Sequence, residues 1–433
     1  MMDILKLIRK FERRERRRME EQYEYYIGKQ NILKKAAKAP GKPDNRLVTN
    51  YAKNIVNNTV GYYLGKPVVY DTDDAALMDQ IDAVTKYNDD AFHNTQLGKD
   101  VSVFGRAAEI LYLDSDDRIR YTKINPMNLC VGYSDDVEKR IEYAIRWYDV
   151  TDENDRETRH IEYYTEKDVS YYTYRGSLVF DRTEPHYWGD VPINVYENNE
   201  DCMGDYEDTI PLMDAYNVMQ SESVNDFQKF ADALLMVKNQ VVTKETAEQL
   251  RDNNILELFD DGEASWLVKQ VNDAYVENIK NRIEKDIYMS TNTVNMSDSE
   301  FANNASGVAI SYKLICMENR VSCTERYFKK ALQRRFELIC NMLNLRGGNF
   351  DYTDIGITFS RNLPPNLQEL ATTIQQLSGI VSSRTLLAQL PFVESVEQEL
   401  QNIAEETGGY ADNFEGDVND TGGILAETDR PAV

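Results

Sequence analysis

The stretch SGVAISYKLICMENRVSCTERYFKKALQRRFELICNMLNL (Ser306–Leu345) decides the fold. Large apolar residues recur in it at every third or fourth position, which is typical of an α-helix with one buried face. These residues are Ile310, Leu314, Met317, Val321, Phe328, Leu332, Phe336, Ile339 and Leu343. Ser306 is a suitable N-cap, and Gly347–Gly348 ends the pattern. A helix of about 38 residues is roughly 57 Å long, more than a small globular domain needs.

Two more helices are predicted upstream, separated by a small insert. Residues 208–238 and 272–290 each carry an apolar stripe at helical spacing. The insert, residues 239–271, contains strand-like pieces around the turn Asp260–Asp261–Gly262. Residues 291–305 are polar and cannot bury a core. Long helices with so little chain between them often provide the surfaces through which copies of one chain pack together.

The N-terminal half predicts helices followed by a β-rich lobe. Residues 1–30 and Asn45–Gly65 show helical periodicity, as do Leu77–Asn88 and Ala91–Phe104. Gly105–Tyr196 changes to a period of two and is rich in tyrosine and β-branched residues, which indicates β-meanders.

The C-terminal part continues as short elements. DIGITF (Asp354–Phe359) predicts one strand, and residues 363–406 predict two or three short helices. Residues 407–433 are rich in Gly and Asp, a composition typical of a disordered tail. The whole pattern indicates an α+β chain.

Charge is distributed unevenly along the chain. Residues 1–46 contain 14 Lys and Arg against 7 Asp and Glu, a net of +7, whereas the whole chain carries −25, which leaves −32 for the remainder. A protein that grips phosphates over a broad surface is normally basic overall. The balance argues against a DNA clamp, but it allows a protein that handles DNA without holding it tightly.

The sequence shows no motif for catalysis or cofactor binding. GYYLGKP (Gly61–Pro67) has its glycines too close for a phosphate-binding loop. DSDDRIRYTKIN (Asp114–Asn125) starts like a calcium loop but has Ile119 where that loop needs Gly. The three histidines share no ligand spacing, which argues against zinc or a His-based triad. We therefore expect no cofactor, no metal and no enzymatic activity.

Cysteine usage and hydropathy suggest the compartment. The five cysteines lie far apart without a CxxC pair, which indicates reduced thiols in a cytosolic setting. No apolar run approaches the length of about 18 residues that indicates a transmembrane helix, so none is expected.

Six segments occur in an order that is specific, although each is degenerate by itself. They are NRLVTNYAKNIVNNTVGYYLGKPVVY (Asn45–Tyr70), AAEILYLDSDDRIRYTKINPMNLCVGYSDD (Ala107–Asp136), AIRWY (Ala144–Tyr148), Val191–Asn217, NDFQKFADALLMV (Asn225–Val237) and NASGVAISYKL (Asn304–Leu314). With these segments the chain resembles the portal, or head-to-tail connector, proteins of long-tailed double-stranded DNA bacteriophages. The resemblance covers all but the two ends.

The resemblance implies an elongated portal fold assembled as a ring, usually of twelve copies and alternatively thirteen, at one vertex of the capsid. It implies a structural protein of the virion that is assembled in the host cytoplasm. The expected partners are double-stranded DNA in the channel, the large terminase, which supplies the ATP hydrolysis, the scaffold and major capsid proteins, and a head-completion adaptor. No membrane is expected.

The resemblance also divides the chain into parts. These would be a β-rich wing with N-terminal helices (residues 1–207), a two-helix stem (208–238 and 272–290), a small α/β clip (239–271), a tunnel loop (291–305), a long wing helix with a wing strand (306–362), a helical crown (363–406) and the acidic tail (407–433).

A channel that passes DNA in both directions must not hold it, because phosphate contacts add up steeply. Acidic walls with a few basic or amide groups meet this need. The candidate DNA-facing residues are Lys280, Lys285, Asn292, Asn295, Asn303 and Asn304. The alternative is that the two lysines pair with Glu277 and Glu284 on the helix surface. In the clip, the candidates for contact with the motor or the adaptor are Asp260, Asp261 and Trp266.

Two other functions remain open. One is a DNA-processing enzyme whose acidic residues bind Mg²⁺. The other is a membrane-surface scaffold anchored by the first helix, in which apolar residues at helical spacing precede an arginine cluster.

Overall fold

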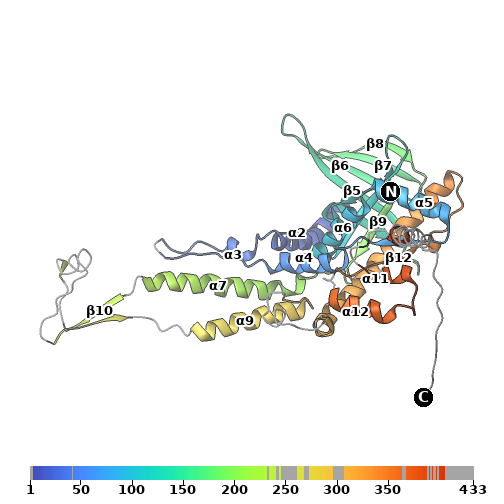
Figure 1. Cartoon of the computed structure of the whole chain (residues 1–433). Helices are drawn as coiled ribbons and strands as arrows, with labels where there is room; N and C mark the ends of the chain where they lie inside the picture. Colours follow the sequence, from blue (N-terminus) through green and yellow to red (C-terminus); the bar gives the residue numbers. More distant parts are fainter. Residues whose placement is uncertain are drawn as a thin grey trace, which may run out of the picture. The chain divides into compact units, whose positions relative to one another are not determined.

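In the computed structural model the chain is a mixed α+β protein with several antiparallel sheets (Figure 1). The structure describes residues 3–40, 42–231, 234–239, 243–244, 261–267, 273–295, 307–362, 367–387, 390, 393, 396 and 399–404. The chain divides into two compact units, Met1–Asn362 and Leu363–Val433. The second unit contains α12 (Leu367–Leu377) and α13 (Ser383–Leu387), in agreement with the short helices expected there.

The first unit begins with a helical segment made of α1 (Ile4–Phe11), η1 (Glu12–Arg16) and α2 (Arg17–Tyr26). η1 is a turn of π-helix. The apolar side of α1 is buried, and Phe11 packs edge-on against Trp147 with the ring centroids 5.6 Å apart. The predicted N-terminal helix is therefore confirmed, and its apolar side forms part of the core. The short helix α3 (Asn31–Lys34) follows.

The next helix begins later than its periodicity suggested. The sequence predicted a helix from Asn45, but α4 spans Tyr51–Tyr63. The Asn50 side chain accepts a hydrogen bond from the Lys53 N–H at 3.0 Å, and so caps the helix at this point.

Residues 45–49, which we call the strap, lie along α7 (Ile210–Ala231) instead. Every second backbone N–H of the strap donates to an α7 side chain: Asn45 to Asn225 (2.7 Å), Leu47 to Ser221 (2.9 Å) and Thr49 to Asn217 (2.8 Å). Two extended residues advance about 6.7 Å and four helical residues about 6.0 Å, so the two rows stay in register. All three α7 side chains are buried. A polar row therefore holds the strap where a helix would otherwise begin.

Two antiparallel sheets form the predicted β-rich region. The smaller sheet has the order β3-β2-β9, and the larger is the meander β4-β5-β6-β7-β8. The strands are β2 (Arg106–Leu113), β3 (Ile119–Ile124), β4 (Leu129–Tyr133), β5 (Ile141–Thr151), β6 (Glu157–Tyr164), β7 (Asp168–Tyr174), β8 (Leu178–Pro185) and β9 (Ile193–Glu197). A buried apolar cluster includes Ala108 and Ile193 of the first sheet and Ala144 and Val169 of the second, and so joins the two.

Helices α5 (Ala75–Tyr87) and α6 (Asp90–Phe104) precede the sheets, as predicted. α6 ends at Gly105, whose φ is 77°. A Cβ on this glycine would lie 1.9 Å from the carbonyl oxygen of Cys202, so only glycine fits the turn into β2.

Three long helices organise the rest of the first unit. α7 and α9 (Asp273–Ser290) lie side by side, and α11 (Gly307–Leu345) forms the long predicted helix (Figure 1). The helix expected over residues 208–238 is shorter than predicted, because Leu234–Lys238 forms strand β10 and pairs antiparallel with β11 (Glu263–Leu267). Pairing with a strand distant in sequence overrides the helical period there. The predicted strand after α11 is β12 (Gly356–Thr358), which pairs with β1 (Val69–Asp71).

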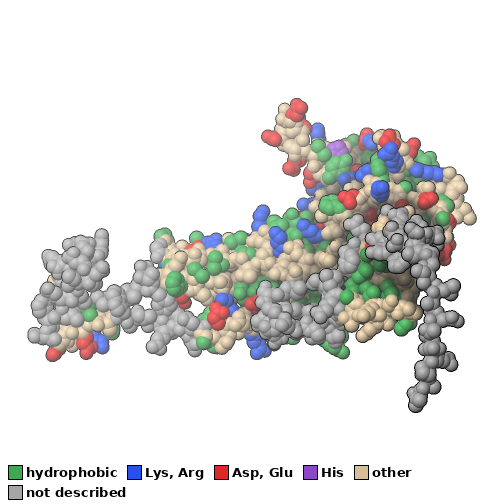
Figure 2. Space-filling view, viewed as in Figure 1, with side chains coloured by type: hydrophobic (Ala, Val, Ile, Leu, Met, Phe, Trp, Pro, Cys, Tyr) green, Lys and Arg blue, Asp and Glu red, His purple; other side chains and the backbone are tan. Residues whose placement is uncertain are grey.

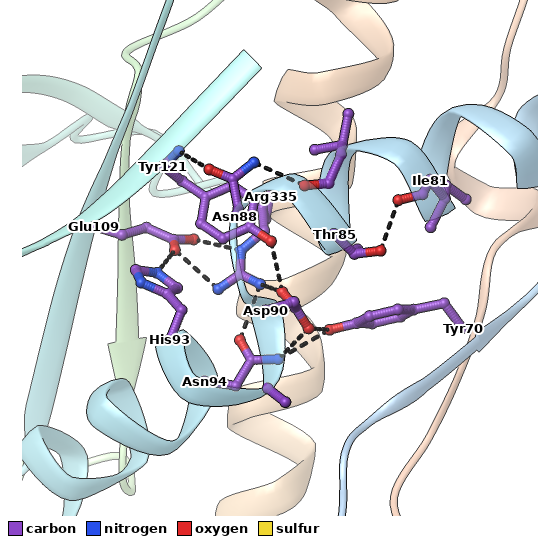
Figure 3. Close-up of polar contacts among 12 residues, drawn as sticks. Tyr70, Ile81, Thr85, Asn88, Asp90, His93, Asn94, Glu109, Tyr121 and Arg335 are labelled. Atoms are coloured by element: carbon purple, nitrogen blue, oxygen red, sulfur yellow. Dashed lines mark hydrogen bonds and ion pairs between the residues drawn. The ribbon is translucent and has the colours of Figure 1, made fainter. Parts of the chain in front are cut away.

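A buried charge network ties α11 to the rest of the unit (Figure 3). Arg335 of α11 makes two hydrogen bonds to Glu109 of β2, each 2.9 Å, and one to Asp90 of α6 at 2.7 Å. The two carboxylates also bind neighbours on four elements. These neighbours are Tyr70 of β1 (2.7 Å), Tyr121 of β3 (2.8 Å), His93 of α6 (2.7 Å) and Tyr196 of β9 (2.6 Å).

The network keeps Glu109 and Arg335 in their charged forms. Burial by itself raises the pKa of the Glu109 carboxyl, but the Arg335 charge and the His93 hydrogen bond bring that pKa well below its usual range. Likewise, burial lowers the pKa of Arg335, but the charge of Glu109 outweighs it and the pKa is raised. Each charge depends on the other, because a buried ion without its partner is costly.

A second group of ion pairs holds α11 nearer its start. Arg361, after β12, donates to both carboxylate oxygens of Glu318 and to Glu325 at 2.6 Å. Hydrogen bonds from Arg361 lower the pKa of Glu318 to about 2.

Replacing Arg335 with Met should destabilise the first unit by about 3–5 kcal/mol, because Glu109 and Asp90 are then buried without a counter-charge. Urea unfolding followed by tryptophan fluorescence measures the change. The control is Arg326→Met, an exposed position on the same helix, for which a change within about 0.5 kcal/mol is expected. Equal effects of the two substitutions would contradict the stabilising role of the Arg335 network.

Replacing Ser221 with Ala should release the strap, because the Leu47 N–H loses its acceptor. The cost of an unsatisfied group, about 1–3 kcal/mol, corresponds to amide exchange at Leu47 that is roughly tenfold faster or more. Hydrogen-exchange mass spectrometry of the strap measures it. Ser223→Ala is the matched control, because among the described residues the Ser223 hydroxyl bonds only the Met219 carbonyl. Unchanged exchange in the Ser221 variant would contradict this role.

Candidate DNA-facing and docking surfaces

The two predicted DNA-facing lysines of α9 lie in different environments. Lys280 is tied down, because its Nζ lies 2.9 Å from Glu277 and its side chain is only 12% exposed. It also lies 6.0 Å from the centre of the Tyr216 ring on α7. Lys285 is exposed. Pairing with Glu277, which the sequence left open, is thus observed for Lys280, while Glu284 accepts a hydrogen bond from Asn295 at 3.0 Å.

Asn292 ends α9. Its φ is 49°, in the left-handed region that Asn tolerates better than most residues. The Thr293 N–H donates back across it to the Tyr288 carbonyl at 3.0 Å, as in a Schellman cap. Asn292 is exposed, so it can combine this structural role with a contact to a ligand.

Arg320 of α11, which the sequence analysis did not single out, fixes the same end of α9. It donates to the Thr291 carbonyl and, at 2.7 Å, to the Thr59 hydroxyl of α4. It also lies 3.1 Å from Asp205. A cation at a helix C-terminus is favourable because the last carbonyls are unpaired. An arginine inside a long helix carries no local signal of this role.

The predicted tunnel loop therefore starts from a fixed point. Residues 291–295 are held by Arg320 and by the bond between Asn295 and Glu284. The other two predicted loop residues, Asn303 and Asn304, lie outside the described residues.

Two of the three predicted clip candidates lie in or next to the antiparallel pair of strands β10 and β11. Asp261 is exposed, and its carbonyl accepts a hydrogen bond from the Asn239 side chain at 3.3 Å. Trp266 lies in β11 opposite Leu235. Asp260 lies outside the described residues.

The Arg335 network brings three charged side chains together, but its geometry is that of a structural element. Its arginine and both carboxylates are buried and paired. A cavity of about 280 Å³ is lined in part by Asn194 and Ala331, which lie at the edge of the network. It does not reach Arg335, Glu109 or Asp90. Among the described residues, no group of three or more His, Cys, Asp and Glu could hold a metal ion.

The first helix does not present an apolar side to a membrane. Ile4, Ile8 and Phe11 are buried within the protein, whereas a helix that lies on a membrane inserts such residues into the lipid. Within the part of the chain that the structure describes, no helix has the length and apolar character needed to span a bilayer.

Comparisons with known proteins identify the family. The family model described as "Phage portal protein, SPP1 Gp6-like" matches residues 5–412. The chain is 25% identical over 403 residues to the portal protein of Bacillus phage SPP1, which covers 88% of this chain and 80% of that protein. It is 23% identical over 427 residues to the portal protein of Clostridium phage phiCD119, which covers 91% of this chain and 94% of that protein. The chain therefore belongs to the SPP1 Gp6-like family of phage portal proteins, which are structural, non-enzymatic head-tail connectors for DNA packaging at the capsid vertex.

Proposed function

We propose that twelve copies of the chain, with thirteen as the alternative, form a ring around a channel for double-stranded DNA. Membership of the family implies an oligomeric ring, an interaction with DNA and a place at the capsid vertex of the virion. In our proposal α7 and α9 form the stem, residues 239–271 the clip and residues 291–305 the tunnel loop. The wing comprises residues 1–207 and 306–362, and the crown residues 363–406.

Exposed apolar side chains on the long helices carry this proposal. Phe227 of α7 is 77% exposed and Tyr312 of α11 is 71% exposed; Met289 of α9 and Ile315 of α11 are also exposed. Figure 2 shows apolar side chains among polar ones along the stem helices. In our proposal these side chains belong to the contacts between neighbouring copies, which would bury them. A ring needs two different surfaces on each copy, one for each neighbour.

The stem supports DNA passage without retention. Together α7 and α9 contain seven Asp and Glu against four Lys and Arg, so a wall built from these helices is mildly acidic and does not attract phosphates. Lys285 and Asn292 are exposed at and near the end of α9, and in our proposal they make the brief contacts that centre the duplex. Lys280 contributes less, because Glu277 already neutralises it.

Docking of other proteins is assigned to the clip and to the wing. In our proposal the clip, with Asp260, Asp261 and Trp266, binds the large terminase during packaging and the head-completion adaptor afterwards. The wing meets the scaffold and major capsid proteins. The exposure of Asp261 close to the start of β11 supports this assignment, because segments next to regular structure often carry binding residues.

Replacing Phe227 with Asp should shift the purified protein from rings to monomers, because a charge then replaces an apolar side chain in the subunit contact. Burying an unpaired charge costs several kcal/mol. This cost arises at every contact between neighbouring copies in the ring. Native mass spectrometry and negative-stain microscopy measure assembly. Val137→Asp, in the fully exposed turn between β4 and β5, is the control and should leave rings intact. Intact rings with Phe227→Asp would overturn this assignment of the interface.

A photoreactive amino acid in place of Lys285 should crosslink to DNA in filled particles, because this side chain faces the duplex in our proposal. The same replacement at Lys86, an exposed residue of α5, should not crosslink. Gel analysis of labelled DNA after irradiation measures the products. Crosslinking at both positions or at neither would contradict the proposed channel wall.

A further inference from the structure

Six cations lie exposed on one side of the first helical segment. They are Lys6, Arg9, Lys10, Arg13, Arg14 and Arg17. Within the described residues, the only ion pair that any of them makes is Arg14 with the adjacent Glu15 at 3.8 Å, and the Arg14 side chain remains 86% exposed. A row of unneutralised positive charge therefore stands on a chain whose net charge is −25. We call this row the basic stripe.

The two acidic residues within this run pair mainly with arginines that are not part of the basic stripe. Glu12 accepts a hydrogen bond from Arg159 of β6 at 2.8 Å, and Glu15 pairs with Arg106 of β2 at 3.3 Å. Glu12 also lies 3.7 Å from Arg16, which is not part of the stripe. Both carboxylates lie in η1, the turn of π-helix. Their carboxylates bind arginines of the two sheets, so among the described residues the outward cations other than Arg14 have no ion-pair partner.

The basic stripe is held rigidly. On the opposite side of the segment Ile4, Ile8, Phe11 and Met19 are buried. A surface whose backbone is already ordered loses less entropy on binding than a flexible tail of the same charge. The same burial leaves no apolar side for insertion into lipid.

The chemistry of the basic stripe fits a phosphate backbone better than a protein. Four of the six cations are arginines, whose planar guanidinium groups bind phosphate in a bidentate manner. From Lys6 to Arg17 the helix rises about 16 Å, close to the roughly 17 Å that six successive phosphates of one DNA strand span along the duplex axis. No large apolar side chain between residues 3 and 17 is among the exposed ones, whereas protein interfaces need such anchors.

We propose that the basic stripe is a second DNA-binding surface, which contacts the backbone of duplex DNA outside the channel. The stripe belongs to a segment that packs on the β-rich region through the contact between Phe11 and Trp147, whereas the proposed channel residues lie at the end of α9. The inference goes beyond the proposed function, because a portal can pass DNA through its channel without it.

Closed circular duplex DNA separates the two surfaces, since a closed circle cannot thread a ring. The full-length protein should bind such a circle with an affinity that falls steeply as salt rises from 50 to 200 mM, as phosphate contacts require. The triple variant Arg9→Gln/Arg13→Gln/Arg17→Gln should bind roughly tenfold or more weakly at 50 mM salt. The slope of log affinity against log salt should fall by about three, one for each lost contact.

The control variant is Lys86→Gln/Arg156→Gln/Lys167→Gln. It removes the same charge from exposed positions in α5 and in two turns of the larger sheet, and its salt slope should change by less than about one. Equal losses in the two variants would reduce the effect to net charge and overturn the proposal. The proposal also fails if poly-glutamate competes as well as DNA at equal charge, which would indicate an acidic protein as the partner. Negative-stain images of each variant check that ring formation is unaffected.

Discussion

The structure depends on the buried ion pairs between Arg335 and the carboxylates of Glu109 and Asp90. These residues come from α11, β2 and α6, and their hydrogen-bonded neighbours add β1, β3 and β9. Arg335 and Glu109 are 226 residues apart in the chain. A long helix packed only by apolar side chains could slide by a turn at modest cost. A bidentate arginine between two carboxylates has one satisfactory position, because any shift leaves buried charges unpaired.

Polar contacts between distant parts of the chain also fix the other long helices. Polar side chains of α7 hold the strap, and Arg320 of α11 holds the end of α9. Directional contacts within the subunit leave apolar side chains such as Phe227 and Tyr312 at the surface. This division suits the proposed ring: buried hydrogen bonds and ion pairs fix the positions of the long helices, and exposed apolar side chains remain for the neighbours.

Charge is separated on the scale of the whole chain. The body of the protein is strongly acidic, yet the outward side of the first helical segment is basic because its own carboxylates are turned toward Arg106 and Arg159. An acidic channel wall favours sliding, whereas a preorganised basic surface favours retention. The two properties can coexist in one portal subunit when they lie on different elements.

The sequence by itself determined the features that depend on local period and order. The helices α9 and α11, the meanders after Gly105 and the order of family segments follow from patterns within short windows, because apolar spacing reports which side of an element is buried. The sequence also predicted that Lys280 and Lys285 lie on one helix. It did not decide that Lys280 pairs with Glu277 while Lys285 stays exposed. Only the tertiary structure decided that α4 begins at Tyr51, that α7 ends before Leu234 and that Arg320 and Arg335 are structural residues. Each of these outcomes is set by a partner far away in the chain, and a hydrogen bond or ion pair to a distant residue leaves no periodic signal in the sequence around it.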